Sequence, residues 1–240
     1  MRRDHRPYYI KKFHLKVQEL YARYFIKPQF DYLGDGFTFL NPWNIEIFGA
    51  PIKIGRHANI ITTSDHKVRF TVWAKQKDKG KITIGDYCLI CPGVRISSAE
   101  KIVIADNCMI ASSAYITDTD WHDIYNRVHS LGNPGAVHIG ENVWIGDSAI
   151  ICKGVHIGEN SIVGASSVVI HSIPPNVIAA GNPARVVKEL DPKIPFVKRA
   201  EWFADPAMLA NDIDQLDKNN LTGNTLLHWL RTLLFPKNTD

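Results

Sequence analysis

The stretch that decides the fold is IGENVWIGDSAIICKGVHIGENSIVGASSVVIHSIPPNVIAA, residues 139–180. It divides into seven consecutive six-residue words, the first being IGENVW. The second position is mostly glycine and the fifth is mostly small. A period of six matches neither the amphipathic helix nor the alternating strand, and it is the spacing of short strands and tight corners in a β-helix. The first position of six words is β-branched: Ile139, Ile145, Ile151, Ile157, Val163 and Val169.

The same period recurs upstream and sets the expected limits of the domain. Isoleucines lie six apart from Ile84 to Ile102 and again, after a slip of two residues, from Ile104 to Ile116. Three words make one triangular coil, so we predict a mainly β fold in which a β-helix occupies residues 45–190. Two segments without the six-residue register, 62–81 and 123–138, are expected to be excursions from the stack.

Helical additions are expected at both ends, in a segment covering 1–44 and an extension covering 191–240. Residues 8–27 have apolar side chains at helical spacing, and residues 1–30 hold eight Lys or Arg against two acids. This helix is expected to cap the first coil, although a basic helix also suits a membrane surface or another anionic partner. Asn224 or Thr225 is expected to begin a second helix, which docks on the stack or on a neighbouring subunit.

Composition excludes several classes of protein. The chain has 240 residues, of which 45% are hydrophobic and 22% charged, and no apolar run reaches the length of a membrane span. No signal peptide follows the basic N-terminus, so a cytoplasmic location is expected. Basic residues gather at one end without a recognition motif, which argues against nucleic acid as a partner. The four cysteines follow the repeat and are expected to pack in the coils rather than bind metal: Cys88, Cys91, Cys108 and Cys152.

The repeat breaks at a histidine, and this break is the candidate active site. The first-position residue after Ile116 is His122, and the small fifth position before it is Asp120. Local rules tend to fail at functional sites, and histidine is the usual general base near neutral pH. One of Asp118 and Asp120 is expected to orient it or raise its basicity. The alternative is that His122 is an ordinary loop residue. Two histidines in or beside the second excursion are backup candidates: His129 and His138.

The words, the break TDTDWHD (117–123) and the segment AAGNPARVVKEL (179–190) together resemble the hexapeptide-repeat acyltransferases, closest to the sugar and polysaccharide O-acetyltransferase branch. The resemblance implies a left-handed parallel β-helix and a homotrimer with active sites between subunits. It further implies that acetyl-CoA is the cosubstrate and that no metal is required. A hydroxyl of a sugar or surface-polysaccharide precursor would be the acceptor, attacking the thioester directly after losing its proton to His122. A lipid-linked acceptor would place the protein at the inner face of the membrane, in peripheral contact with it.

The same resemblance assigns a donor site. Trp144 matches an aromatic residue lining the cleft, and Ala165 matches a position whose backbone contacts the pantetheine arm. Arg185 and Lys188 match basic positions near the CoA phosphates, which suits charge-assisted recognition.

Other readings of the sequence remain open. Within the acyltransferases, the alternative acceptor is an amino sugar or a small xenobiotic. A non-catalytic β-helix scaffold would bind no CoA, since fold alone does not establish activity. A metal-dependent lyase resembling the γ-class carbonic anhydrases is disfavoured, because His156 has no partner histidine at the spacing of that family.

Overall fold

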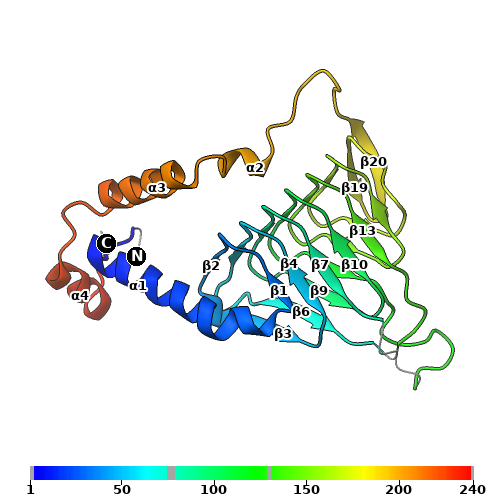
Figure 1. Ribbon diagram of the computed structural model, residues 1–240, viewed down its shortest axis with the longest axis horizontal. Helices are drawn as coiled ribbons and strands as arrows, with labels where there is room; N and C mark the ends of the chain where they lie inside the picture. The colour runs from blue at the N-terminus through cyan, green and yellow to red at the C-terminus, as the bar shows by residue number, and fades with distance from the viewer. Residues whose placement is uncertain (1–2, 75–78, 129–130, 239–240) are drawn as a thin grey trace. The chain divides into compact units, whose positions relative to one another are not determined.

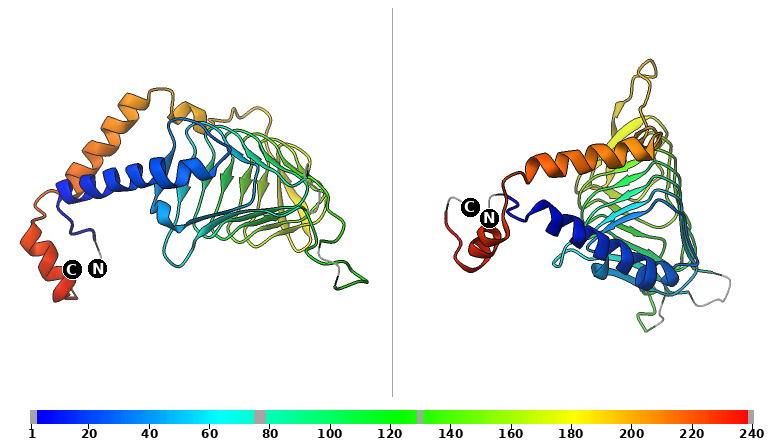
Figure 2. Two further views of the ribbon diagram at one scale, coloured as in Figure 1. Left: turned by 60° about the horizontal axis from the view of Figure 1, so that its bottom comes forward. Right: turned by 60° about the vertical axis from the view of Figure 1, so that its left-hand side comes forward.

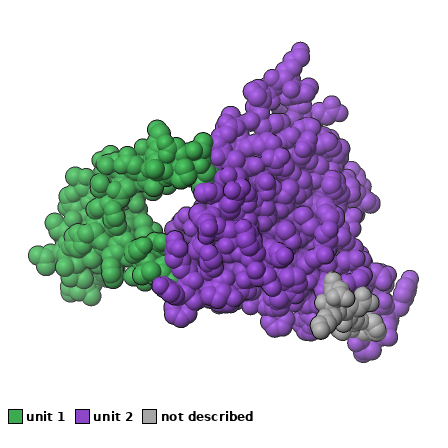
Figure 3. Space-filling view, viewed as in Figure 1, with its two compact units in different colours: residues 1–20, 202–240 green, residues 21–201 purple. Residues whose placement is uncertain are grey.

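Stacked short parallel strands form the core of the structure, a computed structural model that describes residues 3–74, 79–128 and 131–238 (Figure 1). The chain forms two compact units, residues 21–201 and residues 1–20 with 202–240 (Figure 3). The larger unit contains three sheets, here named A, B and C, which the chain visits in turn. Each strand pairs with the strand one coil away, so the unit is a parallel β-helix of stacked coils, as Figure 2 shows.

The strands have the following bounds. Sheet A contains β1 (Tyr32–Leu33), β4 (Ile52–Ile54), β7 (Ile82–Ile84), β10 (Ile102–Ile104), β13 (Val137–Ile139) and β16 (His156–Ile157). Sheet B contains β2 (Thr38–Leu40), β5 (Asn59–Ile61), β8 (Leu89–Ile90), β11 (Met109–Ile110), β14 (Trp144–Ile145), β17 (Ile162–Val163), β19 (Val177–Gly181) and the antiparallel β20 (Ala184–Glu189). Sheet C contains β3 (Ile45–Phe48), β6 (Val68–Val72), β9 (Arg95–Ser98), β12 (Tyr115–Thr117), β15 (Ile150–Ile151) and β18 (Val168–Val169).

The six-residue words produce the core as predicted. Ile110 pairs with Ile90 below it and Ile145 above it, and all three are fully buried. Each coil therefore covers the apolar face of its neighbours, and the stack accumulates buried area coil by coil. Cys88 and Cys108 are buried, and all four cysteines are free thiols.

An asparagine ladder holds the corner between sheets A and B. Asn142 adopts a left-handed backbone conformation (φ 57°), which asparagine tolerates better than most residues. Its side-chain amide donates to Asn160 at 3.0 Å, and that of Asn160 donates to Asn176 at 2.9 Å. The ladder satisfies polar groups on three consecutive coils.

The β-helix begins earlier than the expected residue 45. Leu33, Phe39 and Ile45 are six apart and buried, so residues 32–44 belong to the first coil. Leucine and phenylalanine replace the β-branched residue of the later words at the inward position, so the register is less visible in this part of the sequence. Pro42–Asn44 forms a short 3₁₀ turn within this coil.

The expected excursion at 62–81 is also shorter than predicted. It contains β6, whose Val68, Phe70 and Val72 point into the core and pair in register with β3 and β9. The alternation of these apolar residues with Arg69 and Thr71 is the period of a half-buried strand. Of the predicted excursion, residues 62–67, 73–74 and 79–81 are outside strands, and residues 75–78 lie outside the described range.

Helices precede and follow the β-helix in the sequence. Helix α1 (Tyr8–Tyr21) continues along the chain as a π-helical turn (Ala22–Ile26) and a 3₁₀ turn (Lys27–Gln29), which end close to residue 27, the last residue of the expected helix. Helix α4 (Leu226–Leu234) starts as expected, with the Thr225 side chain accepting from His228 N. Two further helices were not predicted: α2 (Arg199–Trp202) and α3 (Pro206–Asn220). Among the described residues, none of the helices combines the length and apolar character that crossing a membrane requires.

Candidate functional site

Both excursions leave the β-helix at the same place, the corner where the chain passes from sheet C to sheet A. One follows β6 and the other follows β12, two coils away. Between them lies a pocket of about 360 Å³, here called the corner pocket. Its lining comes from both excursions and from the strand between them: Thr71, Trp73, Ser97, Trp121, His122 and Leu131.

His122 lies at the base of the second excursion, where the loop closes on itself. Leu131 N donates to Trp121 O at 3.2 Å, and Gly132 N donates to Asp120 O at 2.7 Å. The side chain of His122 is exposed and lines the corner pocket. Within the described part of the chain, no hydrogen bond to the His122 ring is found, so its nitrogens are available to a substrate hydroxyl.

Trp121 fixes the loop to the scaffold. Its indole Nε1 donates to the Tyr115 hydroxyl at 2.9 Å. The Arg95 guanidinium lies over the Tyr115 ring, 4.4 Å from the centroid. This contact is of the cation–π kind. Sequence reasoning missed Tyr115 and Trp121, because their contact joins a strand to a loop that returns to it, and no motif signals such a return.

Asp118 does not serve His122, contrary to one of the two expectations. It is fully buried, and its carboxylate accepts from the Ser98 hydroxyl at 2.6 Å. It also accepts from three backbone amides of the corner after β9: Ala99 at 2.7 Å, Glu100 at 3.0 Å and Lys101 at 2.7 Å. Oδ2 accepts three of these hydrogen bonds and Oδ1 accepts the one from Ala99, so the Asp118 carboxylate holds the corner of the preceding coil.

Asp120 is placed beside the loop rather than against the His122 ring. Its carboxylate accepts a very short hydrogen bond from Lys153 Nζ, which also donates to Asn133 O at 2.8 Å. Lys153 follows β15 in the next coil, so this ion pair ties the excursion to the scaffold on the other side. Asp120 is therefore a positioning residue for the loop.

Of the two backup histidines, only His138 lies in the described part of the chain, and it is not in the lining of the corner pocket. His129 lies outside the described residues. His138 is on β13 in sheet A, and its ring lies 6.3 Å from that of His156 on the next coil. Burial is the largest cause that lowers the pKa of His138, and the nearby Lys101 ammonium and His156 lower it further. His138 thus has a histidine neighbour that the sequence spacing did not reveal, although no cluster of three or more metal-ligating side chains is found over the described ranges.

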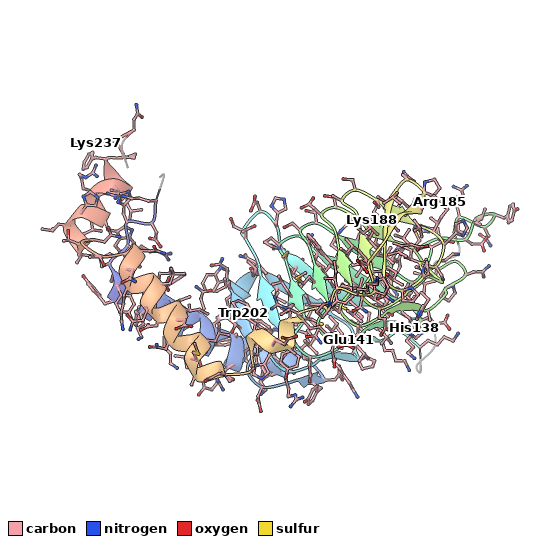
Figure 4. All side chains as sticks on the ribbon, turned by 90° about the horizontal axis from the view of Figure 1, so that it is seen from above. His138, Glu141, Arg185, Lys188, Trp202 and Lys237 are labelled. Carbon is pink, nitrogen blue, oxygen red and sulfur yellow. The ribbon has the colours of Figure 1, made fainter. Side chains whose placement is uncertain are left out.

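The other four predicted site residues gather on a separate surface, here called the sheet B strip: Trp144, Ala165, Arg185 and Lys188. Trp144 pairs with Ile162, Ile162 with Ile178, and Ile178 with Lys188. With strands about 4.8 Å apart, Trp144 and Lys188 are separated by roughly 14 Å across the sheet. Figure 4 shows Arg185 and Lys188 near each other at one end of the β-helix.

The middle of the sheet B strip is a bare corner. Ala165 is exposed in the turn between β17 and β18. A Cβ built on Gly146 would lie 2.6 Å from Ala165 N, and one on Gly164 would lie 2.9 Å from Ala180 Cβ. Glycines are required here for the coils to stack closely, and the backbone at Ala165 is left accessible. A half-exposed Trp144, an open corner and two exposed cations suit an elongated ligand with a phosphorylated end.

The corner pocket and the sheet B strip lie on different parts of the β-helix. His122 is at the corner between sheets C and A, whereas the strip covers sheet B and its corner with sheet C. Sheet C separates them within one chain. The structure therefore brings Trp144, Ala165, Arg185 and Lys188 together and does not bring His122 to them.

Comparison with known proteins identifies the class. Residues 136–171 match the family model of the bacterial transferase hexapeptide (six repeats). The chain is 32% identical over 145 residues to a provisionally named colanic acid biosynthesis acetyltransferase, WcaF, of Escherichia coli K12, covering 60% of this chain and 72% of that protein. It is 40% identical over 92 residues to the galactoside O-acetyltransferase of the same organism, covering 38% of this chain and 45% of that one.

A solved structure supports the fold. The N-acyltransferase AntD of Bacillus cereus superposes with a TM-score of 0.57 at 23% identity, over 79% of this chain and 96% of that one. The matched repeats and the stacked coils define a transferase built on a parallel β-helix. With its relationship to WcaF extending over 72% of that protein, the chain belongs to the hexapeptide-repeat acyltransferase family and is an acyltransferase.

Proposed function

We propose that this protein transfers an acetyl group from acetyl-CoA to a hydroxyl of a sugar or surface-polysaccharide precursor. The observation that carries the proposal is the position of His122, exposed in a pocket of about 360 Å³ at the base of the second excursion. The names of the relatives support the acceptor class, since they include a galactoside and a colanic acid acetyltransferase. We further propose that the coils are left-handed, as in the family. We keep the division of the chain at residues 190 and 191, and we move the start of the β-helix domain from residue 45 to residue 32.

His122 acts as the general base. Its free ring nitrogen takes the proton of the acceptor hydroxyl as the oxygen attacks the thioester carbonyl carbon. The carbon–sulfur bond then breaks, and the imidazolium returns the proton to the departing thiolate, giving an acetyl ester and free CoA. The thioester is already activated, so neither a protein nucleophile nor a metal ion is needed. Trp73, Trp121 and Leu131 supply apolar walls that limit water around the reacting oxygen.

The sheet B strip holds the donor. Arg185 and Lys188 are exposed cations that suit the CoA phosphates, and the bare corner at Ala165 lets the pantetheine arm approach the backbone. Trp144, 46% exposed, offers a flat apolar surface beside it. Because His122 lies on a different part of the β-helix, we propose that each active site combines the strip of one chain with the corner pocket of another, in a homotrimer. The reaction takes place in the cytoplasm, where acetyl-CoA is available.

Two measurements test this function. Calorimetry should detect acetyl-CoA binding to the wild type, weakened about tenfold or more in Arg185→Ala and unchanged in Lys193→Ala, which removes an exposed lysine elsewhere. Absence of binding to the wild type would favour the non-catalytic scaffold. An amino sugar accepted faster than any sugar hydroxyl would favour N-acetylation.

Complementation tests the shared site. His122→Asn and the double variant Trp144→Ala/Arg185→Ala should each be nearly inactive alone. Mixed trimers, refolded or co-expressed, should recover a fraction of wild-type activity, because some interfaces then combine an intact His122 with an intact strip. Mixed trimers as inactive as either parent would show that the two surfaces do not act across an interface.

A further inference from the structure

A second pocket lies on the outer face of sheet A and is lined by three lysines. Its volume is about 400 Å³, and Lys53, Lys81 and Lys101 surround Thr83 and Val103 on the outer surface of β4, β7 and β10. We call it the lysine pocket. No motif in the sequence points to it, because the lysines are about twenty to thirty residues apart and only the coil period brings them together.

The register of the sheet places these ammonium groups close together. Lys81 and Lys101 immediately precede Ile82 and Ile102, which are paired partners, so the two lysines occupy the same position on adjacent rungs. Adjacent strands are about 4.8 Å apart. Lys53 pairs with Thr83, which lies two residues after Lys81 on the same face. The three lysines therefore lie on adjacent strands and line one pocket.

Nothing in the described ranges neutralises this cluster. None of the ion pairs found there involves Lys53, Lys81 or Lys101. The two acidic residues at the neighbouring corner are engaged elsewhere: Glu100 pairs with Lys79 at 3.4 Å, and Asp118 is occupied by Ser98 and backbone amides. Like charges on adjacent rungs are destabilising. Such a local conflict with stability is typical of a binding site, and it is relieved when an anion binds.

The lysine pocket adjoins the corner pocket that contains His122. Ser98 Oγ accepts from Lys81 N at 3.2 Å and donates to Asp118 at 2.6 Å, while its neighbour Ser97 lines the corner pocket. Asp118 in turn accepts from Lys101 N at 2.7 Å. Between β9 and β10 a single tight turn separates Ser97 of the corner pocket from Lys101 of the lysine pocket, and we infer that one ligand spans both pockets along this coil.

We propose that the acceptor carries a phosphoryl group, which Lys53, Lys81 and Lys101 bind while a sugar hydroxyl of the same molecule reaches His122. This inference rests on the proposed acetyl transfer and specifies its substrate class as a phosphorylated or diphosphate-linked sugar. Lysine ammonium groups act as compact point charges that suit phosphate oxygens. The pocket lies away from the sheet B strip, so the same chain has separate positions for the phosphates of the donor and of the acceptor.

Binding of inorganic pyrophosphate tests the site directly. The full-length protein is saturated with CoA, so that the donor position is filled, and pyrophosphate is titrated in a calorimeter. Wild type and Lys193→Gln, a control that removes one exposed lysine elsewhere, should bind with equal affinity. Lys81→Gln/Lys101→Gln should bind at least tenfold more weakly, should keep its affinity for CoA, and should unfold at the same or a slightly higher temperature because two like charges are gone.

The outcomes separate the two proposals. Absence of pyrophosphate binding to the CoA-loaded wild type, or equal affinity in the double variant, would overturn the lysine pocket while leaving acetyl transfer intact. If CoA itself does not bind, the proposed function fails, and the same titration without CoA still decides the lysine pocket. Glucose 1-phosphate and vesicles containing phosphatidic acid then distinguish a soluble from a lipid-borne phosphoryl group. Lysine-dependent binding of either supports the site, and binding of neither contradicts it.

Discussion

The indole of Trp121 donates a 2.9 Å hydrogen bond to the hydroxyl of Tyr115, and through it the loop carrying His122 is attached to the outer face of sheet C. Trp121 is the residue immediately before His122. Tyr115 is itself held beneath the Arg95 guanidinium, 4.4 Å from its ring centroid. The position of the proposed base therefore depends on a contact between a strand and a returning loop, made by Trp121 of the pocket lining and Tyr115 of β12.

We expect Tyr115→Phe to lower kcat about five- to tenfold while leaving the affinity for acetyl-CoA unchanged. The variant keeps the ring under Arg95 and loses only the hydroxyl, a loss of about 1 kcal/mol in holding the loop. Steady-state kinetics of CoA release and calorimetry measure the two quantities. Tyr125→Phe is the control, since Tyr125 is 96% exposed in the same loop and should behave as wild type. An unchanged kcat in Tyr115→Phe would show that the contact is not needed for positioning.

His122→Asn should lower kcat by about two to four orders of magnitude, the usual contribution of a general base. Its side chain is exposed and has no hydrogen bond within the described residues, so the melting temperature and acetyl-CoA affinity should stay at wild-type values. Kinetics, calorimetry and thermal unfolding on the same preparation check the three expectations. Substantial residual turnover would move the base to another residue.

Substitutions of the two aspartates near His122 should differ sharply in their cost to the stability of the fold. Asp118→Asn replaces one acceptor oxygen by a donor amide facing a hydroxyl and three amides, and should cost about 3 kcal/mol or more, lowering the melting temperature by on the order of 10 °C. Asp120→Asn breaks only the partly exposed pair with Lys153, so it should cost less than about 1 kcal/mol and act mainly on kcat. Thermal unfolding of both variants decides the point, and equal losses of stability would refute the division of roles.

The fold was predictable to the extent that the words keep isoleucine at the inward position. The isoleucines from Ile84 onward, and the pair Ile54 and Ile60 before them, indicate the register. The first coil, where Leu33 and Phe39 fill the inward position, and β6, with Phe70, were not predicted. The family was also predictable, because the words at 139–180 are specific to it.

The surroundings of the candidate site were less accessible from the sequence. His122 is recognisable in the sequence because it breaks the six-residue repeat. The break gives the position of the histidine in the chain but does not reveal which residues surround it. The engagement of Asp118 by Ser98 and the convergence of Lys81 with Lys101 depend on contacts between coils some twenty residues apart. Such contacts follow from the register of the stack and cannot be derived from local spacing.

Close stacking beneath Ala165 provides another test. A Cβ on Gly146 would lie 2.6 Å from Ala165 N, and one on Gly85 would lie 2.7 Å from Asp106 N. Gly146→Ala and Gly85→Ala should each cost about 1–3 kcal/mol of stability by overpacking a corner. Only Gly146→Ala displaces the sheet B strip, so only this variant should bind acetyl-CoA more weakly. Calorimetry at a temperature where both variants are folded measures the two affinities. Equal affinity in both variants would argue that the backbone at Ala165 does not contact the donor.

The helical unit should respond to acid through Asp214. The Asp214 carboxylate on α3 accepts from Lys218 at 2.8 Å, from the Tyr8 hydroxyl, and from Lys12 at 3.2 Å, which joins α3 to α1. These contacts hold the pKa of Asp214 well below its ordinary value of 3.8. The hydrogen bond from Lys218 lowers this pKa most, followed by those from Tyr8 and Lys12. A lowered pKa in the folded state means that the carboxylate stabilises the folded state above its ordinary pKa and loses this contribution as the pH falls towards the folded value.

Asp214→Asn should therefore weaken the α1–α3 contact at neutral pH, and its difference from wild type should narrow when both are compared at about pH 3. Helix melting by far-ultraviolet circular dichroism measures the difference at each pH. Asp212→Asn, an exposed residue on the same helix, should match wild type at both. If the gap between Asp214→Asn and wild type were constant over this range, the stabilisation would come from packing of the side chain and not from its charge.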